Sequence, residues 1–274
     1  MKNILVPIDF STVSQNASKY AASLADVFEA RVTLVNVIPP AIITNSEVDS
    51  FLSMERLEVL AANESTMTEE IERFSNKHSI KVEGFVEEGI PSDIIQAKAA
   101  EKHADIIIMG IKGKGKSNSV FGSTTTAVVR KSTIPVLIIP ETVFYQSVAT
   151  ITFATDFEAD TESDRYTLLM EIAKKYNSFI QILNVQKEGK QMSNDEFIGK
   201  MDTYFAFKGF KHSFNTIEDK GVTEGIRKFI DEKSCDMLAM MAHKHSFFER
   251  MLGKAHTEEM SYETRLPLLV LQNK

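Results

Sequence analysis

The sequence predicts an α/β protein built from two tandem three-layer α/β/α domains, each an open, mostly parallel five-stranded sheet with helices on both faces. Three observations predict this fold. The chain has 274 residues, a length typical of about two domains. Its series of short apolar runs occurs twice in the same order. In each half the runs alternate with helix-length segments, as expected for parallel strands joined by right-handed crossovers.

The duplication is visible in matching segments of the two halves. Each half begins with an apolar run followed by Asp-Phe, has a second run ending in Asn-Val, and ends with a very apolar run. The matching pairs are residues 3–11 with 150–158, 30–38 with 179–186, 87–110 with 218–241, and 132–140 with 264–272. We therefore predict one domain over residues 1–143 and a second over 144–274, with the boundary near ETVFYQS at 141–147.

The elements of the first half can be assigned in order from their residue patterns. The apolar run at 4–8 predicts a strand, and the amphipathic stretch at 14–28 predicts a helix. The β-branched run at 32–38 predicts a second strand. Residues 39–50 are typical of a loop, and about 50–77 of a long polar helix.

The rest of the first half continues the alternation. Pro91 and Asp93 mark a helix start, because proline is tolerated in the first turn and Asp favours the positive end of the helix. Strand, helix, strand, helix and strand are expected at 82–89, 91–103, 105–110, 123–131 and 136–140. The second half repeats this order, with a first helix at 161–176 and a shorter, Phe-rich helix around 193–207.

Composition excludes several classes of protein. With 31 Lys and Arg against 38 Asp and Glu, the net charge of −7 argues against non-specific binding to nucleic acid or anionic membranes. No apolar run approaches the ~20 residues that span a bilayer, and Asp9 stands where a signal peptide would still be apolar. Cys235 is the only cysteine, so no internal disulfide can form. We expect a cytoplasmic protein.

The segment richest in chemistry follows the fourth strand of the first half. Residues 109–126 contain glycines and three lysines in an otherwise acidic chain and run into a short predicted helix. Glycines permit close backbone approach and leave N–H groups free to face an anion. The helix start at Gly122, Ser123 and Thr124 adds free N–H groups and the helix dipole. Because ligands of open parallel sheets bind at the carboxyl ends of strands, we expect a phosphate site here.

Two other interpretations of this segment stay open. One is a mobile, solvated glycine-lysine loop with an ordinary serine cap. The other is the phosphate loop of nucleotide hydrolases, because residues 110–117 satisfy G-x-x-x-x-G-K-[ST]. That loop opens directly into a helix, and Gly122 would interrupt such a helix after one turn. The spacing therefore favours a separate helix start after Gly122.

Read as Gly-x2-Gly-x8-Gly-Ser, the segment resembles the universal stress protein family, together with VPIDFS near the N-terminus and TIPVLIIP at the end of the first half. The resemblance covers both halves. ATP-binding members carry Gly-x2-Gly-x9-Gly followed by Ser or Thr, so the spacer here is one residue shorter. The resemblance implies an adenine nucleotide alpha hydrolase-like fold, ATP with or without Mg²⁺ as the ligand, and no tightly bound metal. The residues it implies in binding are Asp9, Val37, Gly110, Gly113, Gly122, Ser123 and Thr124.

Asp9 has two open interpretations. It contacts the ligand, or it caps the following turn as Asp often does after a strand. In the second half, Met241 and Lys244 replace Gly110 and Gly113. Their Cβ atoms block close backbone approach and disfavour positive φ. We therefore expect no ATP in the second half.

No catalytic arrangement is evident in the sequence. It lacks a G-x-S-x-G elbow, and nothing positions a water or a general base, so a slow ATPase is the most that we expect. His243, His245 and His256 form no compact zinc motif with Cys235. Three functions stay open: a nucleotide-sensing regulator that acts through an unknown protein partner, a nucleotide-independent scaffold, and an ATP hydrolase or phosphotransferase.

The resemblance also implies how the strands assemble. In the family, the last strands pair across a two-fold axis and form a dimer. A duplicated chain can make this contact internally, which protects both edges. We therefore expect residues 136–139 to pair antiparallel with 268–271 of the same chain, and two chains to associate further as a homo-oligomer.

Overall fold

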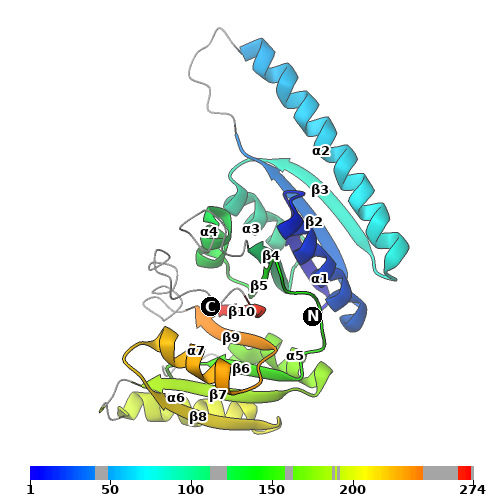
Figure 1. Ribbon diagram of the computed structural model, residues 1–274. Helices are drawn as coiled ribbons and strands as arrows, with labels where there is room; N and C mark the ends of the chain where they lie inside the picture. Colours follow the sequence, from blue (N-terminus) through cyan, green and yellow to red (C-terminus); the bar gives the residue numbers. More distant parts are fainter. Residues whose placement is uncertain are drawn as a thin grey trace.

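The computed structural model describes residues 1–40, 49–111, 122–157, 163–186, 189, 192–242 and 265–272. Within them, ten strands form one sheet that runs through both halves of the chain (Figure 1). The strand order is β3-β2-β1-β4-β5-β10-β9-β6-β7-β8. Each half contributes five strands, and the predicted α/β class is confirmed.

The bounds of the elements follow the predicted alternation of strands and helices. The first half contains β1 (Asn3–Pro7), α1 (Thr12–Phe28), β2 (Arg31–Ile38), α2 (Asp49–Lys77), β3 (Val82–Glu88), α3 (Pro91–Glu101), β4 (Ile106–Ile111), α4 (Ser123–Lys131) and β5 (Val136–Pro140). The second half contains β6 (Thr150–Ala154), the 3-10 helix η2 (Ser163–Tyr166), α5 (Thr167–Tyr176), β7 (Phe179–Gln186), α6 (Asn194–Phe207), β8 (His212–Glu218), α7 (Val222–Glu232), β9 (Met237–Ala242) and β10 (Leu268–Gln272).

Helices cover both faces of the sheet, so the molecule has three layers. Alternate side chains of β1 point to opposite layers, as expected for a strand. Ile4 and Val6 belong to the core beneath α1, whereas Leu5 belongs to the core that contains Ile95 of α3 and Val128 of α4. Both cores continue from the first half into the second. Burial on both faces explains why the central strands are continuous apolar runs.

The two halves meet through their last strands. β5 and β10 pair antiparallel, with Val136, Leu137 and Ile138 opposite Val270, Leu269 and Leu268. All five residues of each strand are buried. All other strand pairs in the sheet are parallel. The predicted internal pairing is therefore confirmed.

The duplication extends to individual hydrogen bonds. In the first half, Nδ2 of Asn36 on β2 donates to the carbonyl of Ile8 at 2.8 Å. In the second half, Nδ2 of Asn184 on β7 donates to the carbonyl of Thr155 at 2.9 Å. Each bond ties the second strand of its half to the segment that leaves the first strand. The two halves of the sheet are thus copies in local geometry as well as in strand order.

The segment between the halves is anchored by aromatic side chains. Tyr145 packs edge-on against Tyr20 of α1, with ring centroids 5.3 Å apart, and its hydroxyl lies 2.7 Å from that of Tyr176 on α5. Burial raises the pKa of both Tyr145 and Tyr176. The N-terminal ammonium of Met1 forms an ion pair with Glu171 of α5. These contacts hold the first helices of the two halves together.

None of the helices in the described residues combines the length and apolar character that a membrane crossing requires.

Candidate functional site

The candidate site lies where the strand order of the first half changes direction. β1 has β2 on one side and β4 on the other, and both neighbours run parallel to it. Connections leave such strands toward opposite faces of the sheet, so the loops after β1 and β4 diverge and leave a crevice at their carboxyl ends. Asp9 follows β1, Gly110 lies near the end of β4, and Val37 lies near the end of β2. The fold therefore brings these three predicted residues to one edge of the sheet.

Asp9 caps the turn between β1 and α1. Its Oδ1 accepts hydrogen bonds from the Ser11 hydroxyl at 2.6 Å and from the Ser11 N–H at 3.1 Å. Burial raises the pKa of Asp9, but the hydrogen bonds from Ser11 and Ser14 outweigh it and hold the pKa below its ordinary value of 3.8. The carboxylate is therefore ionised at neutral pH. Its second oxygen makes no hydrogen bond to the described part of the chain, and the residue is exposed.

The turn after Asp9 has an unusual backbone in both halves. Phe10 has a φ of 60°, and Phe157, its counterpart after β6, has a φ of 57°. Such values are uncommon for residues with a Cβ and cost energy unless the surrounding structure imposes them. In the first half, this turn leads directly to Ser11, whose side chain caps α1. The Asp-Phe motif seen in the sequence thus corresponds to a repeated left-handed turn.

Close packing leaves no room for a side chain at Gly110, and the sequence did not reveal this requirement. A Cβ at this position would lie 2.6 Å from the carbonyl oxygen of Val13 and 2.8 Å from Val13 Cγ1. Such distances are too short for real contacts, so the first turn of α1 approaches β4 closely because Gly110 lacks a side chain. Its neighbours Met109 and Ile111 face the core beneath α3 and α4, so the Gly110 side-chain direction is toward α1. Met241 holds the matching place in β9 and is buried.

The start of α4 has no side-chain cap within the described residues. Gly122 is the N-cap residue of the helix, and no atom of the described part of the chain lies within 4 Å of the position where its Cβ would be. The first turn contains Ser123 and Thr124 and no acidic residue. Open N–H groups and the positive end of the helix dipole favour an anion at this position. The helix begins one residue after Gly122, where the Gly-Ser-Thr interpretation places it.

α4 is fixed in place by both halves of the chain. At its C-terminal end, Lys131 donates to the Ser92 hydroxyl at 3.2 Å and forms an ion pair with Asp93. The hydrogen bond from Lys131 lowers the pKa of Asp93. From the second half, Nε2 of Gln272 on β10 donates to the Val129 carbonyl at 3.2 Å. The helix whose N-terminus faces the candidate site is therefore tethered to the last strand of the second half.

The remaining predicted residues are placed only in part. Val37 is half-buried and packs on the face of the sheet that carries α3 and α4. Gly113 lies outside the described residues, as do Lys112, Lys114 and Lys116. The glycine-lysine segment itself, on which the phosphate-loop and mobile-loop alternatives also depend, thus lies outside the described residues.

In the second half, the matching edge of the sheet contains different residues. Met241, near the carboxyl end of β9, stands where the first half has Gly110, whereas Cys235 precedes β9 and lies at the opposite edge of the sheet, where its thiol donates to the Met237 carbonyl at 3.3 Å. Burial raises the pKa of this thiol. The histidines at 243, 245 and 256 lie outside the described residues. Among the described residues, no group of three or more His, Cys, Asp or Glu side chains could hold a metal ion.

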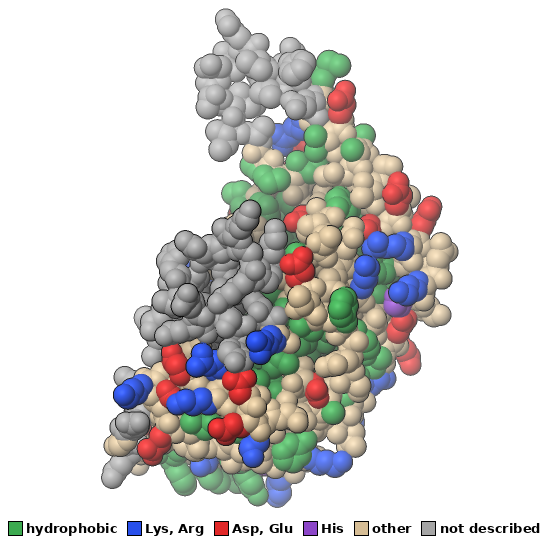
Figure 2. Space-filling view, viewed as in Figure 1, with side chains coloured by type: hydrophobic (Ala, Val, Ile, Leu, Met, Phe, Trp, Pro, Cys, Tyr) green, Lys and Arg blue, Asp and Glu red, His purple; other side chains and the backbone are tan. Residues whose placement is uncertain are grey.

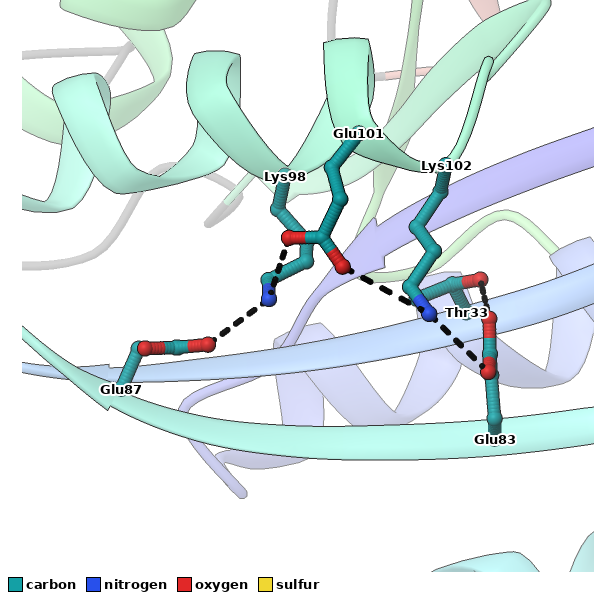
Figure 3. A network of polar contacts seen from close by, with 6 residues as sticks. All are labelled: Thr33, Glu83, Glu87, Lys98, Glu101 and Lys102. Carbon is teal, nitrogen blue, oxygen red and sulfur yellow. Dashed lines mark hydrogen bonds and ion pairs between the residues drawn. The ribbon is translucent and has the colours of Figure 1, made fainter.

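The sequence did not reveal a polar network between α3 and β3. Lys98 is buried and pairs with Glu87 at 2.7 Å and Glu101 at 2.9 Å, while Lys102 pairs with Glu83 at 3.2 Å (Figure 3). Burial lowers the pKa of Lys98, but the hydrogen bonds that Lys98 donates to Glu101 and Glu87 outweigh it, and the net shift is upward. Glu101 lies on α3, three residues after Lys98, whereas Glu83 and Glu87 lie on β3, so only the register of α3 on β3 brings these two carboxylates to the lysines. The network anchors α3 and contacts none of the predicted site residues.

The chain is similar in sequence and in fold to known proteins. Residues 1–140 match the model of the universal stress protein family. Two universal stress proteins of Methanocaldococcus jannaschii, MJ0531 and MJ0577, are 29% identical over 140 residues and 31% identical over 152 residues. Each alignment covers 50% of this chain, and they cover 81% and 94% of those proteins. The whole chain is similar in fold to a universal stress protein from Archaeoglobus fulgidus, with a TM-score of 0.75, 18% identity, and coverage of 99% of this chain and 98% of that one.

Proposed function

Because the chain belongs to the universal stress protein family, we propose that its N-terminal half binds ATP or a related adenine nucleotide and that binding changes its association with partner proteins. We assign residues 1–143 to the nucleotide-binding domain and residues 144–274 to a second domain without a nucleotide site. One solved universal stress protein is a complex with cAMP, so that relative binds an adenine nucleotide. In this chain, residues at the start of α4 and at the ends of β1 and β2 support the proposal.

The observation that carries the proposal is the uncapped start of α4. Gly122 leaves open space at the helix N-terminus, and the first turn adds the hydroxyls of Ser123 and Thr124 without any acidic side chain. These groups suit the phosphates of a nucleotide. Val37 lies on the same face of the sheet as α4 and would border the base. The ionised carboxylate of Asp9, with one oxygen still available, would accept hydrogen bonds from the ribose hydroxyls.

A direct test is calorimetric titration of the full chain with ATP, for the wild type and for Gly122→Val. Gly122 has open space around it and an ordinary φ of −60°, so the valine should fold normally. Its side chain would project where the phosphates approach, and we expect about a tenfold or larger loss of affinity, which is about 1.4 kcal/mol. Gly209→Val is the matched control, because Gly209 also has nothing within 4 Å of its Cβ position but lies in the second half. Absence of binding by the wild type, or equal binding by Gly122→Val, would contradict the proposal.

A second candidate function is a scaffold that works without nucleotide. It is favoured by the close contact of Gly110 with Val13, which explains that glycine without any ligand. Mass spectrometry of the material released when the purified protein is denatured distinguishes the two. A stoichiometric adenine nucleotide supports binding, whereas its absence together with a flat titration supports the scaffold.

A further inference from the structure

The two ends of the ten-stranded sheet differ in how their edges are protected. β3 forms one edge and β8 the other. An edge strand presents unpaired N–H and C=O groups, and proteins commonly block it with charged side chains. β3 carries three carboxylates in seven residues, Glu83, Glu87 and Glu88. Lys98 of α3 pairs with Glu87, and Lys102, directly after α3, pairs with Glu83 (Figure 3). Arg56 of α2 donates to Glu88 at 2.7 Å.

The matching positions in the second half have lost two of these three charges. Phe85 pairs with Val35 of β2, and Asn215 pairs with Leu183 of β7. Val35 and Leu183 hold matching places in their strands, so Phe85 and Asn215 are equivalent positions. Ser213 and Ile217 therefore stand where β3 has Glu83 and Glu87. Within β8 the only carboxylate is Glu218, its last residue. In the described part of the chain, no strand pairs with the outer side of β8.

The backbone of β8 is arranged so that alternate residues face outward. The Ile180 N–H donates to the Lys211 carbonyl, and the Asp219 N–H donates to the Gln186 carbonyl. In a parallel pair, the N–H and C=O of one residue point to the same side. Odd-numbered residues from 211 to 219 thus face β7. The even-numbered residues, from His212 to Glu218, point their N–H and C=O groups away from the sheet.

An apolar helix surface adjoins this edge. Five large side chains of α6 are exposed: Phe197, Ile198, Met201, Tyr204 and Phe205, with Phe205 62% and Phe197 57% accessible. The Tyr204 ring lies 6.0 Å from that of His212 and 6.3 Å from that of Phe214 on β8. Green side chains gather along the lower margin of Figure 2, where Figure 1 places α6 and β8. Exposed apolar patches of this kind mark interaction surfaces.

We propose that two copies of this chain associate through β8, which pairs antiparallel with β8 of the second copy around a two-fold axis at Asn215. This register places Phe214 opposite Thr216 of the partner and His212 opposite Glu218 of the partner. All four residues have outward-facing backbone groups, so both are hydrogen-bonded pairs, as an antiparallel ladder requires. The same register places His212 of each copy beside Glu218 of the other copy, so a histidine lies next to a carboxylate at both ends of the paired strands.

The area available suits a second copy. Aromatic side chains bury roughly 150–250 Å² each, so the exposed parts of the five α6 side chains come to on the order of 500 Å² per chain. A stable interface needs about 800 Å² per partner, and the paired strand edge supplies the rest. The surface is distinct from the β5–β10 pairing, and it does not depend on nucleotide binding.

Sedimentation velocity of the full chain at tens of micromolar tests the proposal. We expect a particle of twice the 30.7 kDa chain mass for the wild type. Thr216→Pro removes an outward-facing N–H that the monomer does not use, and should give the single chain mass. The matched control is Val86→Pro, at the equivalent outward position of β3, which should stay dimeric. Thermal unfolding of both variants verifies that each is folded. A monomeric wild type, or a dimer that persists in Thr216→Pro, would overturn the proposal.

A cross-linking experiment tests the register itself. In a background with Cys235→Ser, Asn215→Cys would face its own copy across the two-fold axis as a non-hydrogen-bonded pair. The Cα atoms of such pairs lie about 4.5 Å apart, within the range for a disulfide. We expect a covalent dimer under mild oxidation for Asn215→Cys and none for Ser213→Cys, which would face Ile217 of the partner. The reverse result would overturn the register.

Discussion

Asp9 shows how much a single side chain of the candidate site can be explained by local chemistry. Its Oδ1 holds the Ser11 hydroxyl and N–H, and so caps the turn that leads into α1. Of the two interpretations open from the sequence, capping is observed, and ligand contact by the other oxygen stays a proposal. The two roles are compatible because a carboxylate has about four acceptor sites.

The lowered pKa of Asp9 predicts a pH dependence of stability. A carboxyl whose pKa is lower in the folded state than in the unfolded state stabilises the fold when it is ionised in both. This contribution is present above about pH 4–5 and is lost as the pH falls through the folded-state pKa, which lies below 3.8. Comparing unfolding free energies of wild type and Asp9→Asn from pH 7 to 3, we expect a small difference that vanishes at the acid end. A difference that grows on acidification would contradict the assignment.

At the level of single residues, the sequence predicted where Asp9, Val37 and Gly110 lie in the fold better than why each residue type is there. Asp9, Val37 and Gly110 do lie at neighbouring strand ends, because their places after apolar runs fix them there. The role of Gly110 in admitting Val13 could not be predicted, since nothing in the local sequence says which helix will cross which strand. Lys98 was missed for the same reason: its partner Glu87 lies on β3 and meets it only through the packing of α3 on that strand.

At the scale of elements, α1 packs so closely on β4 that no side chain fits at Gly110. Gly110→Ala would place a Cβ 2.6 Å from the Val13 carbonyl oxygen, so the helix or the strand must shift. We expect a loss of about 1–3 kcal/mol in the free energy of unfolding, the usual cost of overpacking. Urea denaturation measures it, with Gly209→Ala as control, which should stay within about 0.5 kcal/mol of the wild type because no described atom lies within 4 Å of its Cβ position. A neutral Gly110→Ala would mean that the two elements pack less closely than described here.

Most strands and helices were predictable because their apolar runs are long and their order is duplicated. The antiparallel pairing of β5 with β10 was predicted from the family resemblance, applied to two very apolar last strands of a duplicated chain. The bare edge at β8 did not follow, because the pattern of β8 is that of an ordinary half-buried strand. Its significance depends on comparison with β3, whose matching positions are charged. That comparison requires the strand registers, which the sequence alone does not supply.

In the whole molecule, one sheet and two cores pass through both halves. The bond from Gln272 to Val129 ties the last strand of the second half to the helix that faces the candidate site. The proposed nucleotide site at the start of α4 is thus connected by a short path to the junction between the halves. The second half supports the first half structurally, while its own matching edge carries Met241 in place of Gly110.

The central claim is that the nucleotide binds only in the first half, and peptide-resolved hydrogen exchange with and without saturating ATP tests it most directly. We expect slower exchange in peptides that contain the ends of β1, β2 and β4 and the first turn of α4. Peptides that contain the matching ends of β6, β7 and β9 should exchange at unchanged rates. Protection in the second half, or no protection anywhere at saturating ATP, would contradict the claim.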